Sequence, residues 1–177
     1  MPVAPPDHSA LSLWDFSLLH YARTDVADLC LRLQDEHGVN VNLLFWCAWL
    51  EQRGCTLDIG HLRSAQKRIH SWDEYYVVPL RQLRRRMKVE YGVADVGIEL
   101  VRSQIKQAEL LAEKQLQLWL ESYVQAWGDM GITNTNSSPP GVNVRFYLQQ
   151  LHVADSVITQ LLHLLGSRPD SVAQERI

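Results

Sequence analysis

The sequence has little cysteine and no long hydrophobic run. Its three cysteines in 177 residues form no C-x-x-C pair, and an odd count without framework spacing fits a reducing compartment. The longest uninterrupted apolar run, Leu43 to Leu50, falls far short of the ~20 residues that span a bilayer. The start of the chain also lacks the basic residues and apolar core of a signal peptide. These absences predict a cytoplasmic protein that does not cross a membrane.

The chain also lacks an excess of either charge. It has 17 basic and 20 acidic residues, and this net charge of −3 gives no overall attraction for nucleic acid or an anionic membrane. The basic residues are concentrated, however: residues 58–93 carry a net charge of +4, residues 1–57 carry −4 and residues 94–177 carry −3. Any anion binding must therefore come from a local patch.

The sequence contains no motif of a known catalytic or metal site. It has no Gly-rich phosphate loop, no G-x-S-x-G elbow and no Cys/His ligand pattern. Its seven histidines form only isolated pairs with carboxylates, such as Asp58 with His61 and His70 with Glu74. Cys55, at a predicted helix end, is expected to be the more accessible thiol. We therefore predict no catalytic residue, no metal and no cofactor, and favour a protein that is not an enzyme.

What the sequence does have is helical periodicity. The stretch from Val41 to Arg53, capped by Asn40 and ended by Gly54, would be apolar on all sides of a helix, which requires cover all round. Residues 95–127 form the longest amphipathic pattern, more than ~40 Å if unbroken. The prediction is an all-α, single-domain bundle of six to eight helices around a buried central helix, with one long amphipathic helix.

Capping signals place the other helices. The predicted N-caps are Ser12, Thr24, Thr56 or Asp58, Asn143 and Asp155. The capping box that begins at Ser71 predicts a helix restart or a sharp bend there. Pro79 lies inside a helical pattern, so we expect a kink near residues 75–79. The helical domain is predicted to span residues 12–166, between a flexible lead at residues 1–11 and a flexible tail at residues 167–177, with a long loop at residues 128–142.

The segment from Pro79 to Lys88 carries the most distinctive charge pattern. On a helix, Arg81, Arg84, Arg85 and Lys88 fall within about 100° of arc, and the leucines and methionine of the segment cluster on a different side. Guanidinium groups suit paired contacts with phosphate or carboxylate. We hypothesise that this face binds an acidic protein or a nucleic acid. The alternative is a solvated helix face that balances the acidic remainder of the domain.

Two other functional interpretations remain open. Trp72, Tyr75 and Tyr76 could line a pocket near the Pro79 bend, gated by the loop at residues 128–142, in a small helical enzyme or ligand-binding protein. The helix at residues 95–127 could instead join copies of the chain into a homo-oligomer. We favour a non-enzymatic interaction or regulatory module that uses the basic helix face.

Three segments are distinctive as a set: Leu13 to Ala22 (LWDFSLLHYA), Leu33 to Leu50 (LQDEHGVNVNLLFWCAWL) and Val78 to Lys88 (VPLRQLRRRMK). Together they resemble an uncharacterised family of short proteobacterial conserved hypothetical proteins, a domain of unknown function. The resemblance is close over the first half of the chain. It implies a free-standing bacterial cytoplasmic protein and brings no catalytic or binding residue with it.

Overall fold

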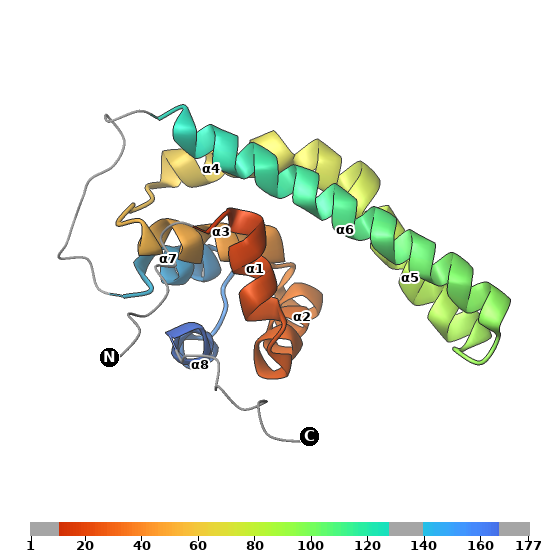
Figure 1. Ribbon diagram of the computed structural model, residues 1–177. Helices are drawn as coiled ribbons and strands as arrows, with labels where there is room; N and C mark the ends of the chain where they lie inside the picture. Colours follow the sequence, from red (N-terminus) through yellow and green to blue (C-terminus); the bar gives the residue numbers. More distant parts are fainter. Residues whose placement is uncertain (1–10, 128–139, 167–177) are drawn as a thin grey trace, which may run out of the picture. The chain divides into compact units, whose positions relative to one another are not determined.

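The computed structural model describes residues 11–127 and 140–166, and all the regular structure in these ranges is helical (Figure 1). The predicted all-α class and the predicted range of helix number are therefore confirmed. The helices are α1 (Leu13–Tyr21), α2 (Thr24–His37), α3 (Val41–Gln52), α4 (Ile59–Trp72), the π-helical turn η2 (Asp73–Val77), α5 (Val78–Tyr91), α6 (Val96–Gln125), α7 (Val142–Gln150) and α8 (Asp155–Gly166). None of these helices combines the length and the apolar composition that a membrane crossing requires.

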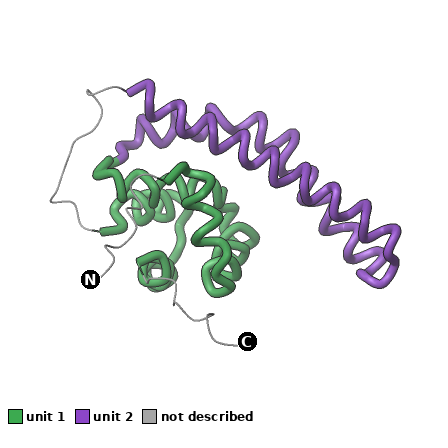
Figure 2. Tube along the Cα trace, in the orientation of Figure 1, with its two compact units in different colours: residues 1–56, 132–177 green, residues 57–131 purple. Residues whose placement is uncertain are grey.

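The chain divides into two compact units (Figure 2). Unit 1 contains α1, α2, α3, α7 and α8, and unit 2 contains α4, η2, α5 and α6. The single domain at residues 12–166 stays a prediction. The predicted lead, almost all of the predicted loop and the predicted tail lie outside the described residues.

Helix α3 is the core of unit 1. Every residue from Asn42 to Leu50 is buried, and α1 and α7 pack against the helix. The Asn40 side chain accepts hydrogen bonds from the N–H groups of Asn42 and Leu43, so the predicted N-cap is confirmed. Full burial of a large apolar side chain such as Trp46 stabilises a fold by about 1.5–3 kcal/mol. The predicted buried central helix is thus confirmed.

The predicted caps of the first two helices have different outcomes. Ser12 accepts a hydrogen bond from the N–H of Asp15 and caps α1, as predicted. Helix α2 begins at Thr24 itself, and Arg23 holds the N-cap position without a side-chain cap bond. The Asp25 carboxylate accepts from the N–H of Val26 instead. The prediction of Thr24 as the cap was therefore wrong, because another acceptor in the first turn takes a free N–H.

The predicted cap of α7 was also wrong, because Asn143 lies inside the helix and is buried. Its side-chain amide donates to the carbonyl oxygens of Cys47 and Cys55, at 3.4 and 2.8 Å. These bonds tie α7 to the end of α3. A short polar side chain can therefore lie in a helix interior where it satisfies carbonyls of another helix.

The N–H groups at the start of α7 bond to Glu51 of α3. Its carboxylate accepts from the backbone N–H groups of Gly141, Asn143 and Val144. Burial raises the pKa of the Glu51 carboxyl, and the hydrogen bonds from Val144, Asn143 and Gly141 only partly oppose this. A carboxylate from another helix thus accepts the hydrogen bonds that a local N-cap side chain would otherwise accept.

Unit 2 accommodates Pro79 without breaking the helix. Helix α4 continues through Ser71 to Trp72, so the predicted restart was wrong, and η2 then leads directly into α5. In this π-helical turn the N–H of Val78 donates to the carbonyl oxygen of Asp73, five residues back. The wider turn lies where the proline ring and its missing N–H would disturb an α-helix. A π-helical turn thus lies at residues 73–77, where a kink near residues 75–79 was predicted, and the kink itself stays a prediction.

Helices α5 and α6 run side by side in opposite directions (Figure 1). The turn between them begins at Gly92, with a φ of 69°, and ends at Asp95, which caps α6 by accepting from the N–H of Ile98. The 30 residues of α6 make it about 45 Å long, which confirms the predicted long helix. We call α5, α6 and their connection the hairpin.

Candidate interaction surface

The hairpin buries none of its side chains over its outer part. From Val78 to Ala108 every residue is half-buried or exposed, and α5 contains no buried residue at all. The apolar side chains in this stretch include Leu80, Leu83, Met87, Val101 and Ile105. Helical stability in proteins comes mainly from packing an apolar face, so the outer hairpin leaves a packing surface open.

Charged side chains fill the seam between α5 and α6. The Arg81 Nε donates to Glu109 Oε1 at 3.1 Å, and Arg81 also donates to Glu113. Arg84 Nη2 donates to Glu109 Oε1 at 3.1 Å, and its Nε donates to the other oxygen. The Glu109 side chain is only 6% exposed, against 16% for Arg81 and 25% for Arg84. Two of the four predicted binding residues thus face α6.

The surroundings of this cluster shift the pKa values of Glu113 and Arg81. Burial raises the pKa of the Glu113 carboxyl, and Arg81 opposes the shift without cancelling it. Burial acts to lower the pKa of Arg81, but the ion pairs with Glu113 and Glu109 outweigh it, so that pKa is raised. The cluster therefore holds firmly charged guanidinium groups against carboxylates that are largely removed from water.

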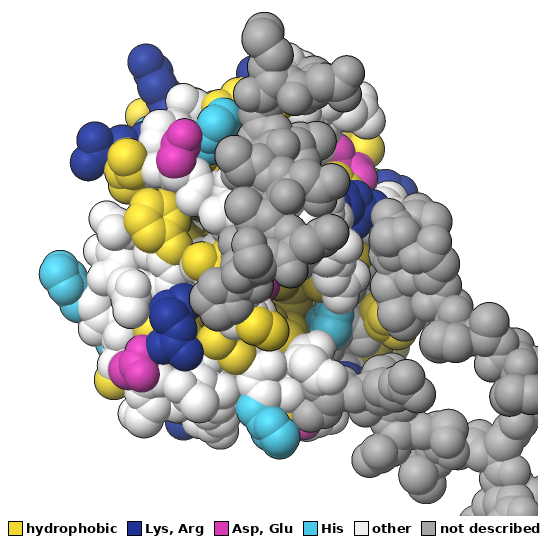
Figure 3. Space-filling view, turned by 90° about the vertical axis from the view of Figure 1, so that its left-hand side faces the viewer, with side chains coloured by type: hydrophobic (Ala, Val, Ile, Leu, Met, Phe, Trp, Pro, Cys, Tyr) yellow, Lys and Arg dark blue, Asp and Glu magenta, His cyan; other side chains and the backbone are white. Residues whose placement is uncertain are grey.

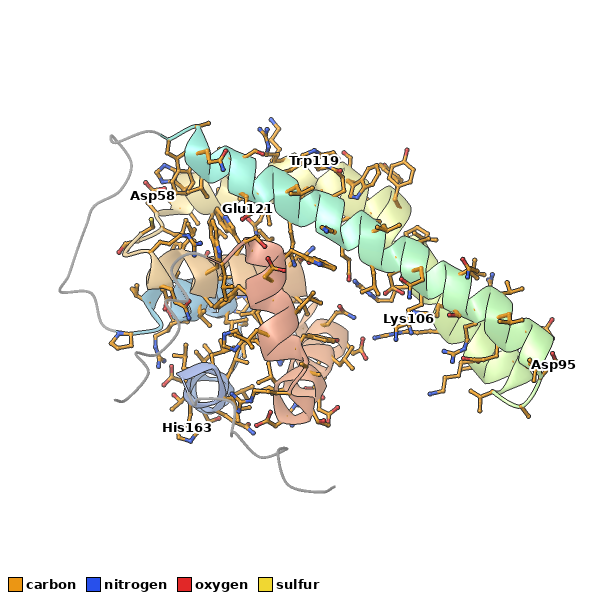
Figure 4. All side chains as sticks on the ribbon, viewed as in Figure 1. Asp58, Asp95, Lys106, Trp119, Glu121 and His163 are labelled. Carbon is orange, nitrogen blue, oxygen red and sulfur yellow. The ribbon has the colours of Figure 1, made fainter. Side chains whose placement is uncertain are left out.

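Other cations of the hairpin are more accessible. Arg85 is half-buried and Lys88 is exposed. Two further cations were not among the predicted binding residues: Arg86, which is 67% exposed and 3.9 Å from Glu90, and Lys106, which is exposed and projects from α6 (Figure 4). Arg86 lies outside the arc of α5 that defined the basic face, and Lys106 lies on the other helix, so the charge pattern of one arc did not include them.

The hairpin has two different sides. Leu80, Leu83 and Met87 lie roughly 100–160° around α5 from Arg81, and Val101 and Ala108 lie roughly 80–100° around α6 from Glu109, counting 100° per residue. In an antiparallel pair these arcs fall on the same side, because α5 and α6 face each other at Arg81 and Glu109. We call these five residues the apolar side.

The opposite side carries charge. Arg85 and Arg86 lie roughly 40° and 140° around α5 from Arg81 in the other direction, and Lys106 lies roughly 60° around α6 from Glu109. We call Arg85, Arg86 and Lys106 the charged side. The segregation means that a partner can meet either apolar or cationic side chains on the hairpin.

The predicted pocket residues lie in different environments. The half-buried Trp72 donates through its indole N–H to the Ala112 carbonyl oxygen at 2.9 Å, and its ring lies 5.2 Å from that of Trp119 and 4.6 Å from that of Tyr76. Tyr75 and Tyr76 are largely exposed. Trp72 therefore packs in the seam, whereas the two tyrosines lie on the surface beside η2.

Thiols and histidines give little basis for another site. Cys55 is buried, at 4% exposure, but it is still the more accessible thiol, as predicted, because Cys30 and Cys47 are 0% exposed. Burial raises the pKa of Cys55. Burial likewise raises the pKa of Cys30 to about 12. Within the described ranges, no three His, Cys, Asp or Glu side chains group closely enough to hold a metal ion. The histidines visible in Figure 3 lie apart from one another.

The fold and this surface define a helical protein with a two-helix hairpin that is incompletely packed from Val78 to Ala108. The chain belongs to the family described as protein of unknown function (DUF2390), which matches residues 12–120. The predicted membership of an uncharacterised family is thereby confirmed. No curated protein and no solved structure matches the chain. The match includes the whole of α5 and most of α6, so the hairpin lies within the family's matched region.

Proposed function

We propose that the protein is a non-enzymatic interaction or regulatory module of a bacterial cytoplasm, and that the hairpin binds an acidic protein partner. One observation carries the proposal: no side chain between Val78 and Ala108 is buried, although both helices of this stretch contain apolar residues at helical spacing.

A two-helix hairpin can bury only the stripe along which its helices meet. Here Arg81, Arg84 and Glu109 occupy much of that stripe, so the apolar residues lie outside it. Exposed apolar surface rimmed by polar residues is typical of protein interaction sites. The arrangement therefore supports binding as the role of the hairpin.

The charged side indicates that a partner carries anionic groups. Arg85, Arg86 and Lys106 lie together there, and Lys88 lies exposed nearer the turn. Accessible guanidinium and ammonium groups recognise carboxylates and phosphates. An acidic protein is favoured over a nucleic acid because the whole chain is net negative, at −3, which opposes the general attraction that nucleic-acid binding needs.

Amide chemical-shift mapping on the full chain tests this role with two probes, poly-glutamate and a single-stranded DNA oligomer. We expect poly-glutamate to shift resonances at Arg85, Arg86 and Lys106, with the effect decreasing as salt is added. The double variant Arg86→Glu, Lys106→Glu should abolish the shifts. The matched control Arg63→Glu, Lys67→Glu, which reverses two exposed cations of α4, should leave them unchanged.

Two results would contradict the proposed partner. One is a pattern of shifts that is spread over both helices and insensitive to the Arg86 and Lys106 reversals. The other is stronger binding of DNA than of poly-glutamate, which would move the proposal to a nucleic-acid partner.

The π-helical turn supports a second candidate, a small helical enzyme or ligand-binding protein. Such turns are frequent at functional sites, and the exposed Tyr75 and Tyr76 lie in this one. Chemical-shift screening with small aromatic compounds tests it. Shifts confined to Tyr75, Tyr76 and the Trp72 indole would support a ligand site, whereas equal shifts at the exposed Tyr91 would show non-specific stacking.

A further inference from the structure

The apolar side of the hairpin has a spacing that suits a helical bundle. On α5, Leu80, Leu83 and Met87 follow at steps of three and four residues, and on α6 Val101 and Ala108 are seven residues, or two helical turns, apart. Such steps are those of helices that meet other helices along a seam. Large side chains thus line α5, and smaller ones line the neighbouring stretch of α6.

Unit 2 offers no third helix to cover this side near the turn. Helix α4 leads into α5 through η2 and contacts α6 at Ala112 and beyond, away from the turn. Trp72 donates to the Ala112 carbonyl oxygen, Arg68 lies over the Tyr123 ring and His61 lies against Trp127. At the apolar side Val101 is 54% exposed, and Leu80, Leu83 and Met87 are half-buried. The described part of unit 2 is therefore two helices thick there.

We propose that the same side of a second copy of this chain covers the apolar side, so that two hairpins form a four-helix bundle. The inference rests on the proposed role of the hairpin in binding and names a further occupant of it. A two-fold contact between copies is isologous, so each surface must complement itself. An apolar surface meets that condition because it brings no like charges together.

The distribution of charge favours a second copy over an acidic partner on this side. Arg85, Arg86 and Lys106, which would repel their equivalents, lie on the charged side. Arg84, which lies between the apolar side and the seam, is neutralised by Glu109 through two hydrogen bonds. An acidic partner would find its counter-charges on the charged side and would gain little from Leu83 and Met87.

The size of the surface is that of a modest interface. From Tyr76 to Tyr91 the helix is about 24 Å long, and two helices side by side are about 20 Å wide. This footprint of roughly 500 Å² in projection approaches the ~600 Å² per partner at the lower end of specific interfaces. We therefore expect a dimer whose population depends on protein concentration.

Sedimentation equilibrium of the full chain tests the proposal. The expected result is a concentration-dependent species of twice the 20.3 kDa chain mass. Leu83→Glu and Val101→Glu should each raise the dimer dissociation constant more than tenfold, with helicity retained by circular dichroism. Val89→Glu is the matched control, because Val89 is 85% exposed and lies roughly 80° around α5 from Arg81 in the direction of the charged side, and it should leave the dissociation constant unchanged.

Cysteine cross-linking provides a second measurement that does not depend on disruptive variants. The three native cysteines are buried, so a bis-maleimide should join two copies through Val101→Cys and not through Val89→Cys. A chain that is monomeric at every concentration would overturn the proposal, as would a dimer that cross-links through Val89→Cys alone. A monomer that still binds poly-glutamate on the charged side would leave the proposed function standing.

Discussion

Arg81 of α5 donates to the nearly buried carboxylate of Glu109 on α6, 28 residues along the chain. The pair crosses the seam of the hairpin at a place where helices usually meet through apolar side chains. It fixes which face of α5 turns toward α6, and so it leaves Leu80, Leu83 and Met87 outside the seam. The charge cluster thereby determines which side of the hairpin is open to a partner.

Removal of the shared carboxylate should destabilise the hairpin. Glu109→Ala leaves Arg81 and Arg84 without their common acceptor, and a fully buried pair that loses one member costs about 3–5 kcal/mol; because both arginines retain some exposure, we expect about 2–3 kcal/mol. Urea unfolding followed by tryptophan fluorescence measures the loss. Arg86→Ala, which removes an exposed cation, is the control and should change little. Equal losses for the two variants would show that the seam cluster contributes no more than a surface pair.

Glu113 should make stability depend on pH. Its pKa in the folded protein is raised above the ordinary 4.5 by burial, so the folded chain holds this proton more tightly than the unfolded chain does. The stability that this group contributes is present below 4.5 and is lost as the pH rises through the raised folded pKa. The free energy of unfolding of the wild type should therefore fall relative to that of Glu113→Gln over this range. Urea titrations from about pH 4 to about pH 8 measure both free energies of unfolding. A wild type that becomes more stable relative to Glu113→Gln as the pH rises would contradict the assignment.

The helix starts were predicted well because a capping side chain lies within a few residues of the N–H groups that it accepts from. Asn40 caps α3 with its own side chain, and Asp58 and Asp95 do the same for α4 and α6. The burial of α3 followed from its lack of a polar face. The charge pattern of α5 also predicted one arc for Arg81 and Arg84, and they do share a face.

Contacts between segments far apart in the sequence could not be predicted from these local patterns. Periodicity defines an arc of α5 but not the neighbour that it meets, and the usual expectation that charge faces water was wrong for Arg81 and Arg84. The spacing of Glu109 and Glu113, four residues apart on a single face of α6, is a signal that could have paired them with arginines. Glu51 was missed in the same way, because a lone carboxylate at the end of an apolar helix does not reveal which N–H groups it will reach.

Glu51→Ala should loosen α7. The substitution removes the acceptor of the N–H groups of Gly141, Asn143 and Val144, and each buried donor left without an acceptor costs ~1–3 kcal/mol, so we expect a loss of at least ~2 kcal/mol. Hydrogen exchange at the first amides of α7 should accelerate more than exchange in α2. Glu51→Gln, which keeps one acceptor oxygen, should show a smaller effect. Unchanged exchange in α7 would show that water replaces the carboxylate at no cost.

Two glycines with left-handed backbones provide a matched pair for the last prediction. Gly38 and Gly141 have φ values of 65° and 83°, so alanine is strained at both, by about 1–2 kcal/mol. A Cβ at Gly38 would meet nothing within 4 Å, whereas a Cβ at Gly141 would come within 2.5 Å of the Leu162 side chain. Because overpacking adds about 1–3 kcal/mol, Gly141→Ala should lose that much more free energy of unfolding than Gly38→Ala. The double variant Gly141→Ala, Leu162→Ala separates the two causes, since it should remove the overlap and keep the backbone strain. If Gly141→Ala and Gly38→Ala lose equal stability in urea unfolding, Leu162 moves aside freely and α7 and α8 do not depend on this close approach.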